Sequence, residues 1–376
     1  MVSTSKSDTQ DLPSLALIDA GIPIRNLWLL MFYASELFRD LETAYRSIED
    51  SPDEIPDLVA EILCRRVEQR LRRQLGFGFQ QRRFDLTRVR GRIDVFDTER
   101  RLLLDKGQVA CRYEELTINT PRNCYVRSAL ETLSRIVHRR ELAHKCQFLA
   151  RSMRKLGVTN GLPPRGSVAI QRYGRHDAED RPMVSAAHLA FNLALPTQDS
   201  GLSALTNPDT DIVWIRSLFE RGVCGFYDVV TEPDGWRVTG GKSWKWPTEQ
   251  PSPRLASIMP IMRTDIVLEH LAAKRRVVID TKFNQIVKPG RHEAEKLRSG
   301  YLYQIYAYLR TQEIASDSLS MSSMGILLHP AVGVSMSESA IIQGHELRFA
   351  TVDLSASAAT IRAQLLEVLE VPHVHR

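Results

Sequence analysis

The chain has 376 residues, of which 43% are hydrophobic and 25% are charged, and its formal net charge is +5. This length and composition predict a soluble globular protein of two or three domains, each with its own core. The longest apolar run, residues 27–34, is too short to cross a bilayer, and residues 1–20 lack the pattern of a signal peptide, so we expect no membrane association. Five cysteines without a C-x-x-C pair predict reduced thiols in a cytoplasmic protein and no zinc site.

Apolar residues at helical spacing predict two helices near the start of the chain. The first covers residues 27–38 and follows a loose polar tail, residues 1–20. The second covers residues 54–75, with apolar residues on one face and arginines on the other. Residues 65–92 contain ten arginines, no lysine and two acids. A solvated helix face explains this cluster, and so does a surface that binds nucleic acid or an acidic partner.

The pattern changes to short alternating segments in residues 79–113, which predicts a small β region. Thr120 followed by Pro121 predicts the start of another helix, because a capping side chain precedes a proline at the first helical position. Residues 142–183 show few periodic signals and several prolines and glycines, so we place a domain boundary near here. The predicted N-terminal domain is therefore an α+β domain of residues 21–183.

Helices and strands alternate in the second predicted domain, residues 184–376. The expected elements are helices at 185–194, 211–223, 294–311 and 356–370, and strands within 226–246, at 266–268, 277–279 and 324–329, and within 342–354. This order predicts a layered α/β domain.

Two short β-branched runs in this domain, residues 266–268 and 277–279, predict the strands of a hairpin. With the turn halfway between them, Asp265 falls directly opposite Asp280. Directly opposed residues have Cβ atoms about 4.5–5.5 Å apart, so two like charges in these positions repel. Strand alternation puts Lys282 on the same face as Asp280. The sequence thus predicts two carboxylates and one ammonium at the ends of two paired strands.

Such a cluster favours a bound cation. Mg²⁺ accepts one or two carboxylates together with waters and phosphate oxygens. The ion would polarise a phosphodiester, while Lys282 would orient the attacking water or help to deprotonate it. An acid followed by acid-x-Lys after an apolar strand is the pattern of the PD-(D/E)xK nucleases. An ordinary surface hairpin with an Asp–Lys pair has the same pattern.

The tripeptide Gly241-Lys242-Ser243 suggests a phosphate-binding loop. That loop needs a glycine where Trp236 stands, and residues 244–247 cannot open the helix that should follow. We therefore expect no nucleotide motor in this chain.

Several separated stretches resemble the McrC family, the nuclease subunits of modification-dependent restriction systems. They are IPIRNLWLLMFYA, VRGRIDV, CRYEELTINTPRNCYVRSAL, LFE, TDIVL, VVIDTKF and YQIYAYL, in this order. The resemblance implies a C-terminal PD-(D/E)xK restriction-endonuclease-like domain and an N-terminal domain that docks on a hexameric AAA+ GTPase of the McrB type. In that family the partner binds GTP and recognises double-stranded DNA that contains modified cytosine, such as 5-methylcytosine. The McrC subunit stimulates GTP hydrolysis and cuts the DNA.

The resemblance also implies the residues of the site. The family positions transfer onto Asp265, Asp280, Lys282, Glu220, Gln304 and Tyr308. The implied cofactor is Mg²⁺, with Mn²⁺ as a substitute, and the implied ligands are Asp265, Asp280 and Glu220. Glu220 equally fits a solvated helix residue, and Gln304 and Tyr308 equally fit residues that only hold a helix on the sheet.

The N-terminal domain contains the predicted partner contacts. Arg90 and Arg92 are the candidates, although both also fit outward residues of an ordinary strand. In the predicted nuclease site, Thr264 stands directly before Asp265, where the family often has proline. This difference leaves the catalytic groups unaffected.

Three functions fit these observations. The leading one is a Mg²⁺-dependent endonuclease subunit of a GTP-driven restriction system. A non-catalytic adaptor that activates the GTPase is the second, and a stand-alone DNA repair nuclease is the third. The intact set of Asp265, Asp280 and Lys282 argues against the adaptor, and the elaborate first 150 residues fit the repair enzyme poorly.

Overall fold

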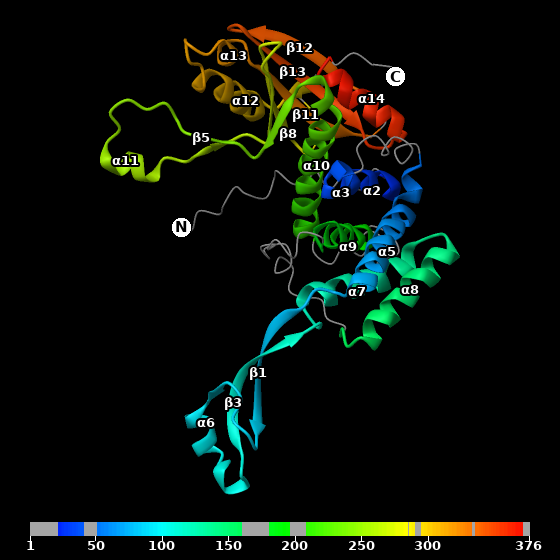
Figure 1. The fold of residues 1–376 in the computed structure, drawn as a ribbon. Coiled ribbons are helices and arrows are strands. Elements are labelled where there is room, and N and C mark those ends of the chain that lie inside the picture. Colours follow the sequence, from blue (N-terminus) through cyan, green and yellow to red (C-terminus); the bar gives the residue numbers. More distant parts are fainter. Residues whose placement is uncertain are drawn as a thin grey trace, which may run out of the picture. The chain divides into compact units, whose positions relative to one another are not determined.

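The computed structural model describes residues 22–40, 51–159, 180–195, 208–284, 286–289, 295–332 and 335–370. It divides the chain into two compact units (Figure 1). The unit of Met1–Ile55 and Leu195–Arg376 is called the sheet unit here, and Pro56–Ala194 is called the helical unit. No helix in the described ranges has the length and apolar character needed to cross a membrane.

This division differs from the predicted limits of 21–183 and 184–376. Helix α2 (Ile24–Tyr33) packs against α10 (Pro208–Val230) of the sheet unit, so the start of the described chain belongs with its C-terminal part. The side chain of Asn26 strengthens this association, because its Nδ2 donates to the carbonyls of Leu354 (2.8 Å) and Ala356 (2.9 Å). The predicted tail, residues 1–20, lies outside the described residues.

The helical unit combines packed helices with a small sheet. Its described helices are α5 (Ile55–Arg73), α6 (Val95–Arg100), α7 (Pro121–Ile136), α8 (Arg140–Lys155) and α9 (Arg181–Ala194), with the 3-10 turn η2 (Leu104–Lys106). Its described strands are β1 (Gly78–Leu86), β2 (Arg92–Ile93) and β3 (Val109–Thr117). As predicted, α7 starts at Pro121, and the Thr120 side chain accepts a hydrogen bond from the N–H of Asn123 (3.1 Å).

Helix α8 was missed by the sequence analysis, which found few periodic signals there. Its buried residues Leu142, Cys146, Leu149 and Met153 follow helical spacing, but they form a narrow stripe among charged residues. The stripe is sufficient because α8 packs along α7.

The small β region is confirmed as an antiparallel sheet in the order β1-β3-β2, with Gly78 opposite Thr117 and Leu86 opposite Val109. We call residues 78–117 the β-arm. Within residues 89–96 of this region Arg92–Ile93 form strand β2, and Gly91 directly before it has a φ of +70°. After the two-residue strand β2, Asp94 caps helix α6 by accepting from the N–H of Asp97 (3.1 Å).

The sheet unit is built around a six-stranded mixed sheet in the order β12-β13-β11-β8-β7-β4. These strands are β4 (Arg237–Gly240), β7 (Ile266–His270), β8 (Arg275–Thr281), β11 (Met324–Ala331), β12 (Ser337–Ile342) and β13 (His345–Asp353). Strands β8, β11 and β13 run parallel to one another, and the pairs β7–β8, β4–β7 and β12–β13 are antiparallel. The mixed α/β class is therefore confirmed.

The remaining described elements of this unit surround the sheet. They are α3 (Glu36–Asp40), α11 (Pro253–Ile258), α12 (Ser299–Thr311), α13 (Ser318–Met321), α14 (Ala358–Val368), β5 (Ser243–Trp244), β6 (Met262–Arg263), β9 (Val287–Pro289), β10 (Glu295–Leu297), and the turns η1 (Pro52–Glu54) and η6 (Glu232–Asp234). Residues 226–230, predicted as strand, continue helix α10, and residues 295–297, predicted as helix, form β10.

Helix α12 covers the face of the sheet that matters for the site. Ile305 and Leu309 of α12 share a buried core with Val267, Val278 and Leu327 of the sheet. Because alternate residues of a strand face one way, Asp280 lies on the same face as Val278. The ends of β7 and β8 thus direct their polar side chains toward the α12 side.

The contact between α2 and α10 is close enough to require glycine. A Cβ added at Gly225 would lie 2.0 Å from the carbonyl oxygen of Tyr33, whereas one added at Gly300 in α12 would meet nothing within 4 Å.

We expect Gly225→Ala to lower the free energy of unfolding by about 2 kcal/mol or more, since the backbone must shift to make room for the Cβ. Gly300→Ala should leave it unchanged or raise it by up to about 1 kcal/mol. Chemical denaturation of both variants measures this, and equal stability of the two would contradict the packing described.

Candidate active site

The register of the β7–β8 hairpin agrees with the sequence prediction. Ile266 pairs with Ile279, Val267 with Val278 and Leu268 with Val277. Asp265 directly precedes β7, Asp280 is the penultimate residue of β8, and Lys282 follows β8. The hairpin therefore brings the two acids and the lysine together at one end of the sheet.

A hydrogen-bonded bridge joins the two strand ends. The Oδ2 of Asp265 accepts from both the N–H (2.8 Å) and the hydroxyl (2.9 Å) of Thr281, the residue between Asp280 and Lys282. Next to Asp265, Thr264 donates its N–H to the carbonyl of Lys242 (3.0 Å). A proline at position 264 could not form that bond.

Asp280 is the most deeply buried charge of the site. Its side chain is 1% exposed, and its Oδ2 lies 2.7 Å from the Nζ of Lys282, which is 19% exposed. Its Oδ1 is buried and has no hydrogen-bond partner among the described residues. Burial raises the pKa of Asp280 to about 6, although the charge of Lys282 opposes this rise and the charge of Asp265 adds to it.

Lys282 is held as an ammonium. Burial lowers its pKa, but the charge and hydrogen bond of Asp280 and the charge of Asp265 outweigh burial, so the pKa lies above its usual value. Its Nζ also lies 5.3 Å from the centre of the Tyr301 ring, within the range of a cation–π contact.

Glu220 of α10 lies beside these groups. A cavity of about 260 Å³ is lined by Arg216, Glu220, Asp265, Thr281, Lys282, Phe283, Asn284 and Tyr301. Burial raises the pKa of the Glu220 carboxyl, and the negative charge of Asp265 raises it further. The structure thus brings Glu220 to the same cavity as Asp265 and Lys282.

Gln304 and Tyr308 lie on α12 and bond to each other. The Nε2 of Gln304 donates to the hydroxyl of Tyr308 (2.6 Å), which in turn donates to the carbonyl of Arg263 in β6 (2.8 Å). Burial raises the pKa of Tyr308, and the charge of Asp280 contributes to this rise. These contacts hold α12 against the strand that leads into Asp265. They place the Tyr308 hydroxyl near enough to the acids for their charges to raise its pKa.

Sequence analysis did not identify a second group of polar residues behind Lys282. The Nδ2 of Asn284 lies 2.5 Å from the hydroxyl of Tyr301, and the carbonyl of Asn284 lies 2.8 Å from the Nδ1 of His329. Burial lowers the pKa of His329 to about 4, so this imidazole is neutral near pH 7. The sequence does carry a signal for Tyr301, because this residue precedes Gln304 by about one helical turn and so lies on the same face of the helix.

The donor set fits Mg²⁺. Asp265 and Asp280 supply hard carboxylate oxygens, and the unpartnered Oδ1 of Asp280 is a buried acceptor that a cation would satisfy. Among the described residues, no group of three or more His, Cys, Asp or Glu side chains is arranged to hold a metal ion. Two carboxylates with waters suffice for Mg²⁺, and Glu220 as a third ligand stays a prediction.

Arg90 and Arg92 belong to the β-arm of the other unit. Arg90 lies outside the strands, with its Nη1 3.6 Å from Glu115 and its guanidinium 4.2 Å from the ring centre of Tyr113. Arg92 is exposed on β2, opposite Arg112. The alternative that both are outward residues of one strand is therefore wrong, and their contact with a partner stays a prediction.

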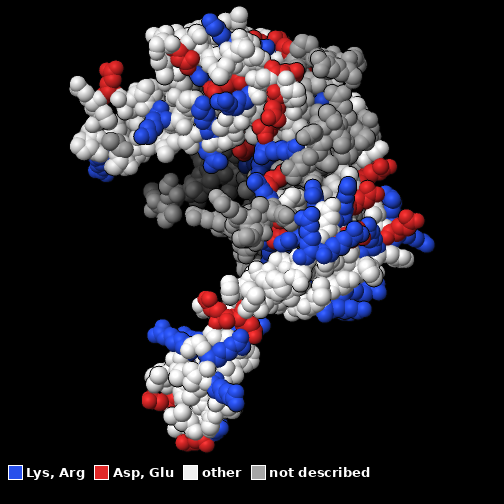
Figure 2. All heavy atoms as spheres, viewed as in Figure 1, with Lys and Arg blue, Asp and Glu red and all other residues white. Residues whose placement is uncertain are grey.

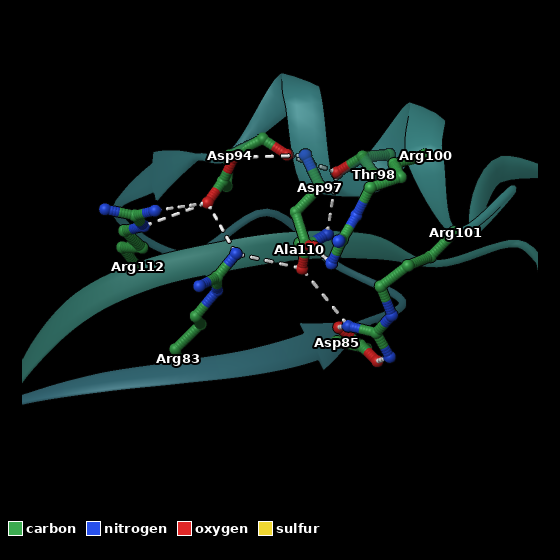
Figure 3. A network of polar contacts seen from close by, with 9 residues as sticks. All are labelled: Arg83, Asp85, Asp94, Asp97, Thr98, Arg100, Arg101, Ala110 and Arg112. Carbon is green, nitrogen blue, oxygen red and sulfur yellow. Dashed lines mark hydrogen bonds and ion pairs between the residues drawn. The ribbon is translucent and has the colours of Figure 1, made fainter.

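The neighbouring arginines of the β-arm form an ion-pair network (Figure 3). Arg112 (2.5 Å) and Arg83 (2.8 Å) converge on Asp94, which also caps α6. Arg101 contacts both Asp85 (2.5 Å) and Asp97 (3.2 Å). Of these three arginines Arg83 belongs to the arginine-rich stretch of residues 65–92, so the network explains one arginine of that stretch as structure of the β-arm itself.

Fold and site together define a mixed α/β protein with an Asp–Asp–Lys cluster at the end of its larger sheet. Residues 3–162 match the family of McrBC 5-methylcytosine restriction system components. The type IV methyl-directed restriction enzyme EcoKMcrBC of Escherichia coli (strain K12) is 23% identical over 353 residues, which cover 93% of this chain and 97% of that protein. These matches confirm the resemblance to the McrC family that the sequence motifs indicated.

Two solved structures are also similar to parts of this chain. One is a refined half-complex from a tetradecameric assembly of Thermococcus gammatolerans McrB AAA+ hexamers with bound McrC (TM-score 0.42, 11% identity, 92% of this chain and 76% of that one). The other is the cryo-EM structure of the Thermococcus gammatolerans McrBC complex (TM-score 0.33, 13% identity, 48% of this chain and 52% of that one).

The raised pKa of Asp280 makes the site sensitive to pH. The pKa of Asp280 is about 6 in the folded state, whereas its ordinary value is 3.8. Between these two pH values the folded state therefore binds more protons than the unfolded state. The stability that the protonated Asp280 contributes is lost as pH rises through about 6. Without metal, Asp280→Asn should therefore unfold at the same free energy as the parent near pH 4. At pH 7 its free energy of unfolding should be higher by about 1 to 3 kcal/mol.

Urea denaturation in EDTA across this pH range measures the difference in the free energy of unfolding between variant and parent. Contributions from groups that titrate alike in both proteins cancel in this difference. Asp265→Asn is the matched control and should give a smaller gain, because the relief of its repulsion with Asp280 is offset by weaker hydrogen bonds to Thr281. A stability difference for Asp280→Asn that does not change with pH would contradict the assignment.

Proposed function

We propose that this chain is the DNA-cleaving subunit of a two-component restriction system, and that its sheet unit is a PD-(D/E)xK nuclease domain. The observation that carries the proposal is the convergence of Asp265, Asp280 and Lys282 at the end of the β7–β8 hairpin, beside the cavity that Glu220 lines. An ordinary surface hairpin has no reason to bury an aspartate whose Oδ1 lacks a hydrogen-bond partner. The resemblance to restriction-system components supports the same chemistry.

In this proposal Asp265 and Asp280 hold Mg²⁺. The bound ion would polarise a phosphodiester and neutralise developing negative charge. Thr281 fixes one oxygen of Asp265 and thereby orients the carboxylate. Because Lys282 is protonated, its role is to bind a phosphate oxygen or orient the attacking water, rather than to remove a proton.

The other predicted residues complete the site from two helices. Glu220 of α10 lines the cavity with a raised pKa, which suits a group that exchanges a proton with water. Gln304 and Tyr308 of α12 are positioning residues, since their hydrogen bonds end on the backbone that leads into Asp265. All three roles are part of the proposal.

The partner in this proposal is an AAA+ GTPase hexamer of the McrB type, which binds GTP and recognises double-stranded DNA with modified cytosine. The tripeptide that suggested a phosphate loop does not open a helix: Gly241 and Lys242 connect β4 with β5, which begins at Ser243. The Nζ of Lys242 lies 4.2 Å from the ring centre of Trp244, and 3.5 Å from Glu269. GTP is therefore assigned to the partner.

The β-arm is the best surface for that partner. Several of its large apolar side chains are exposed: Phe79 (74%), Phe84 (51%), Val95 (60%), Phe96 (77%), Leu102 (66%), Leu104 (64%) and Leu116 (57%). A concentration of exposed apolar residues on one small module is typical of a protein interface. This observation favours a subunit of a complex over a stand-alone repair nuclease.

The first prediction of this proposal concerns cleavage. In the assembled complex, Asp280→Asn and Lys282→Ala should each lower the rate of DNA cleavage by at least about 100-fold, because each removes a charge at the reacting phosphate. EDTA should abolish cleavage, and Mg²⁺ or Mn²⁺ but not Zn²⁺ should restore it, because the donor set contains only oxygens. GTP hydrolysis by the partner serves as the control and should persist in both variants. Normal cleavage by Asp280→Asn would refute the site.

The second prediction concerns docking. Phe96→Asp should weaken binding to the partner at least about 10-fold, because it puts a charge into an apolar interface. Ile341→Asp on β12 is the matched control, since Ile341 is equally exposed (78%) but belongs to the sheet unit. The double substitution Arg90→Glu/Arg92→Glu tests the original candidates in the same assay. Titration of the partner's GTPase rate against each variant measures affinity, and an equal effect of the Phe96 and Ile341 substitutions would argue against the β-arm.

A further inference from the structure

Helix α5 of the helical unit presents a basic face that neither the cavity of the site nor the β-arm uses. Arg66, Gln69, Arg70 and Arg73 are spaced i, i+3, i+4 and i+7, so they share one side of the helix, next to the side that buries Val67. A pocket of about 500 Å³ is lined by Arg66, Gln69, Arg70, Arg72, Arg73 and Pro182. Figure 2 shows lysines and arginines gathered over the C-terminal half of α5.

The acids of α5 do not neutralise this face. Asp57 accepts from the backbone N–H of Arg139 (3.3 Å), and Glu61 pairs with the Arg139 side chain. Glu68 lies 3.1 Å from Lys145 of α8. The negative charges of the helix are thus directed toward the start of α8 and α8 itself, which leaves the pocket side positive.

One acid does contribute to the pocket, and it is buried. Asp180 is 1% exposed and contacts Arg70 (2.6 Å) and Arg122 (3.0 Å). It therefore holds the guanidinium of Arg70 in place at the base of the pocket. Arg66 and Arg72 are exposed and have no ion pair among the residues that the structure describes.

We propose that this pocket binds the phosphate backbone of duplex DNA. Guanidinium groups form paired hydrogen bonds with phosphate oxygens, and several of them around one concave surface suit a polyanion. Among the residues that the structure describes, the lining consists of arginine and glutamine apart from Pro182. A protein partner would favour the apolar anchors found on the β-arm, so the apolar surface and the basic pocket suit different partners.

This DNA contact lies outside the nuclease domain and goes beyond the proposed function. It would let the helical unit bind DNA regardless of sequence, since backbone contacts carry no base information. Its test needs no cleavage, so the outcome is independent of the Asp–Asp–Lys site.

The experiment measures binding of the purified full chain to a fluorescent 30-base-pair duplex by anisotropy, in EDTA, over a range of NaCl concentrations. The variant Arg66→Ala/Arg72→Ala removes two exposed guanidiniums of the pocket. Its plot of log affinity against log salt should be shallower than that of the parent by about 1.8, which is about 0.9 for each lost phosphate contact. Arg66→Lys/Arg72→Lys keeps the charge and should retain most of the slope.

The matched control is Arg151→Ala/Arg154→Ala, which removes two exposed arginines from α8 of the same unit. This control should keep the slope of the parent, and thermal unfolding checks that all variants fold. The proposal is overturned if the parent does not bind the duplex at low salt, if Arg66→Ala/Arg72→Ala binds like the parent, or if the control loses as much. It is also overturned if the pocket variant loses binding to polyglutamate but not to DNA, which would indicate an acidic protein ligand.

Discussion

The pairing of β7 with β8 is the constraint on which the site depends. Antiparallel register places Asp265 and Asp280 at neighbouring strand ends, where their charges repel. Two local interactions make this arrangement tolerable: Thr281 satisfies one oxygen of Asp265, and Lys282 pairs with Asp280. Within the described residues the Oδ1 of Asp280 remains buried and unpartnered, which is an unfavourable state that a bound cation would relieve.

The rest of the sheet unit holds this hairpin rigidly. Strand β11 pairs with β8 over Met324–Leu328, and α12 packs its apolar residues against the same face. Tyr308 connects α12 to the carbonyl of Arg263, two residues before Asp265. The close packing of α2 against Gly225 fixes the position of α10, which is the helix that carries Glu220. Stability and site geometry therefore rest on the same contacts.

The helical unit has a different surface chemistry. Its β-arm exposes aromatic and aliphatic side chains around a network of ion pairs, while its helix α5 exposes arginines around a pocket. Charged networks such as Asp94 with Arg83 and Arg112 can stabilise a small module that has little apolar core. Such a module is then free to expose its apolar residues to a partner.

Local patterns in the sequence by themselves determined much of this protein. The hairpin register, the start of α7 at Pro121, and the grouping of Asp265, Asp280 and Lys282 follow from residues close together in the chain. Strand alternation and helix capping act over a few residues, so they can be read without a structure.

Only the tertiary structure decided the features that depend on distant contacts. The sequence could not show that α2 packs on α10, because an apolar helix face does not specify its partner. It could not place Arg90 outside the strands, where the Arg90 N–H lies 3.5 Å from the Sγ of Cys111, a residue 21 positions further along the chain. The contact of Tyr301 with Asn284 and the buried pairing of Asp180 with Arg70 and Arg122 likewise join residues from separate elements. Packing, which brings such residues within hydrogen-bond distance, is the physical reason that these parts of the two candidate sites appear only in the folded chain.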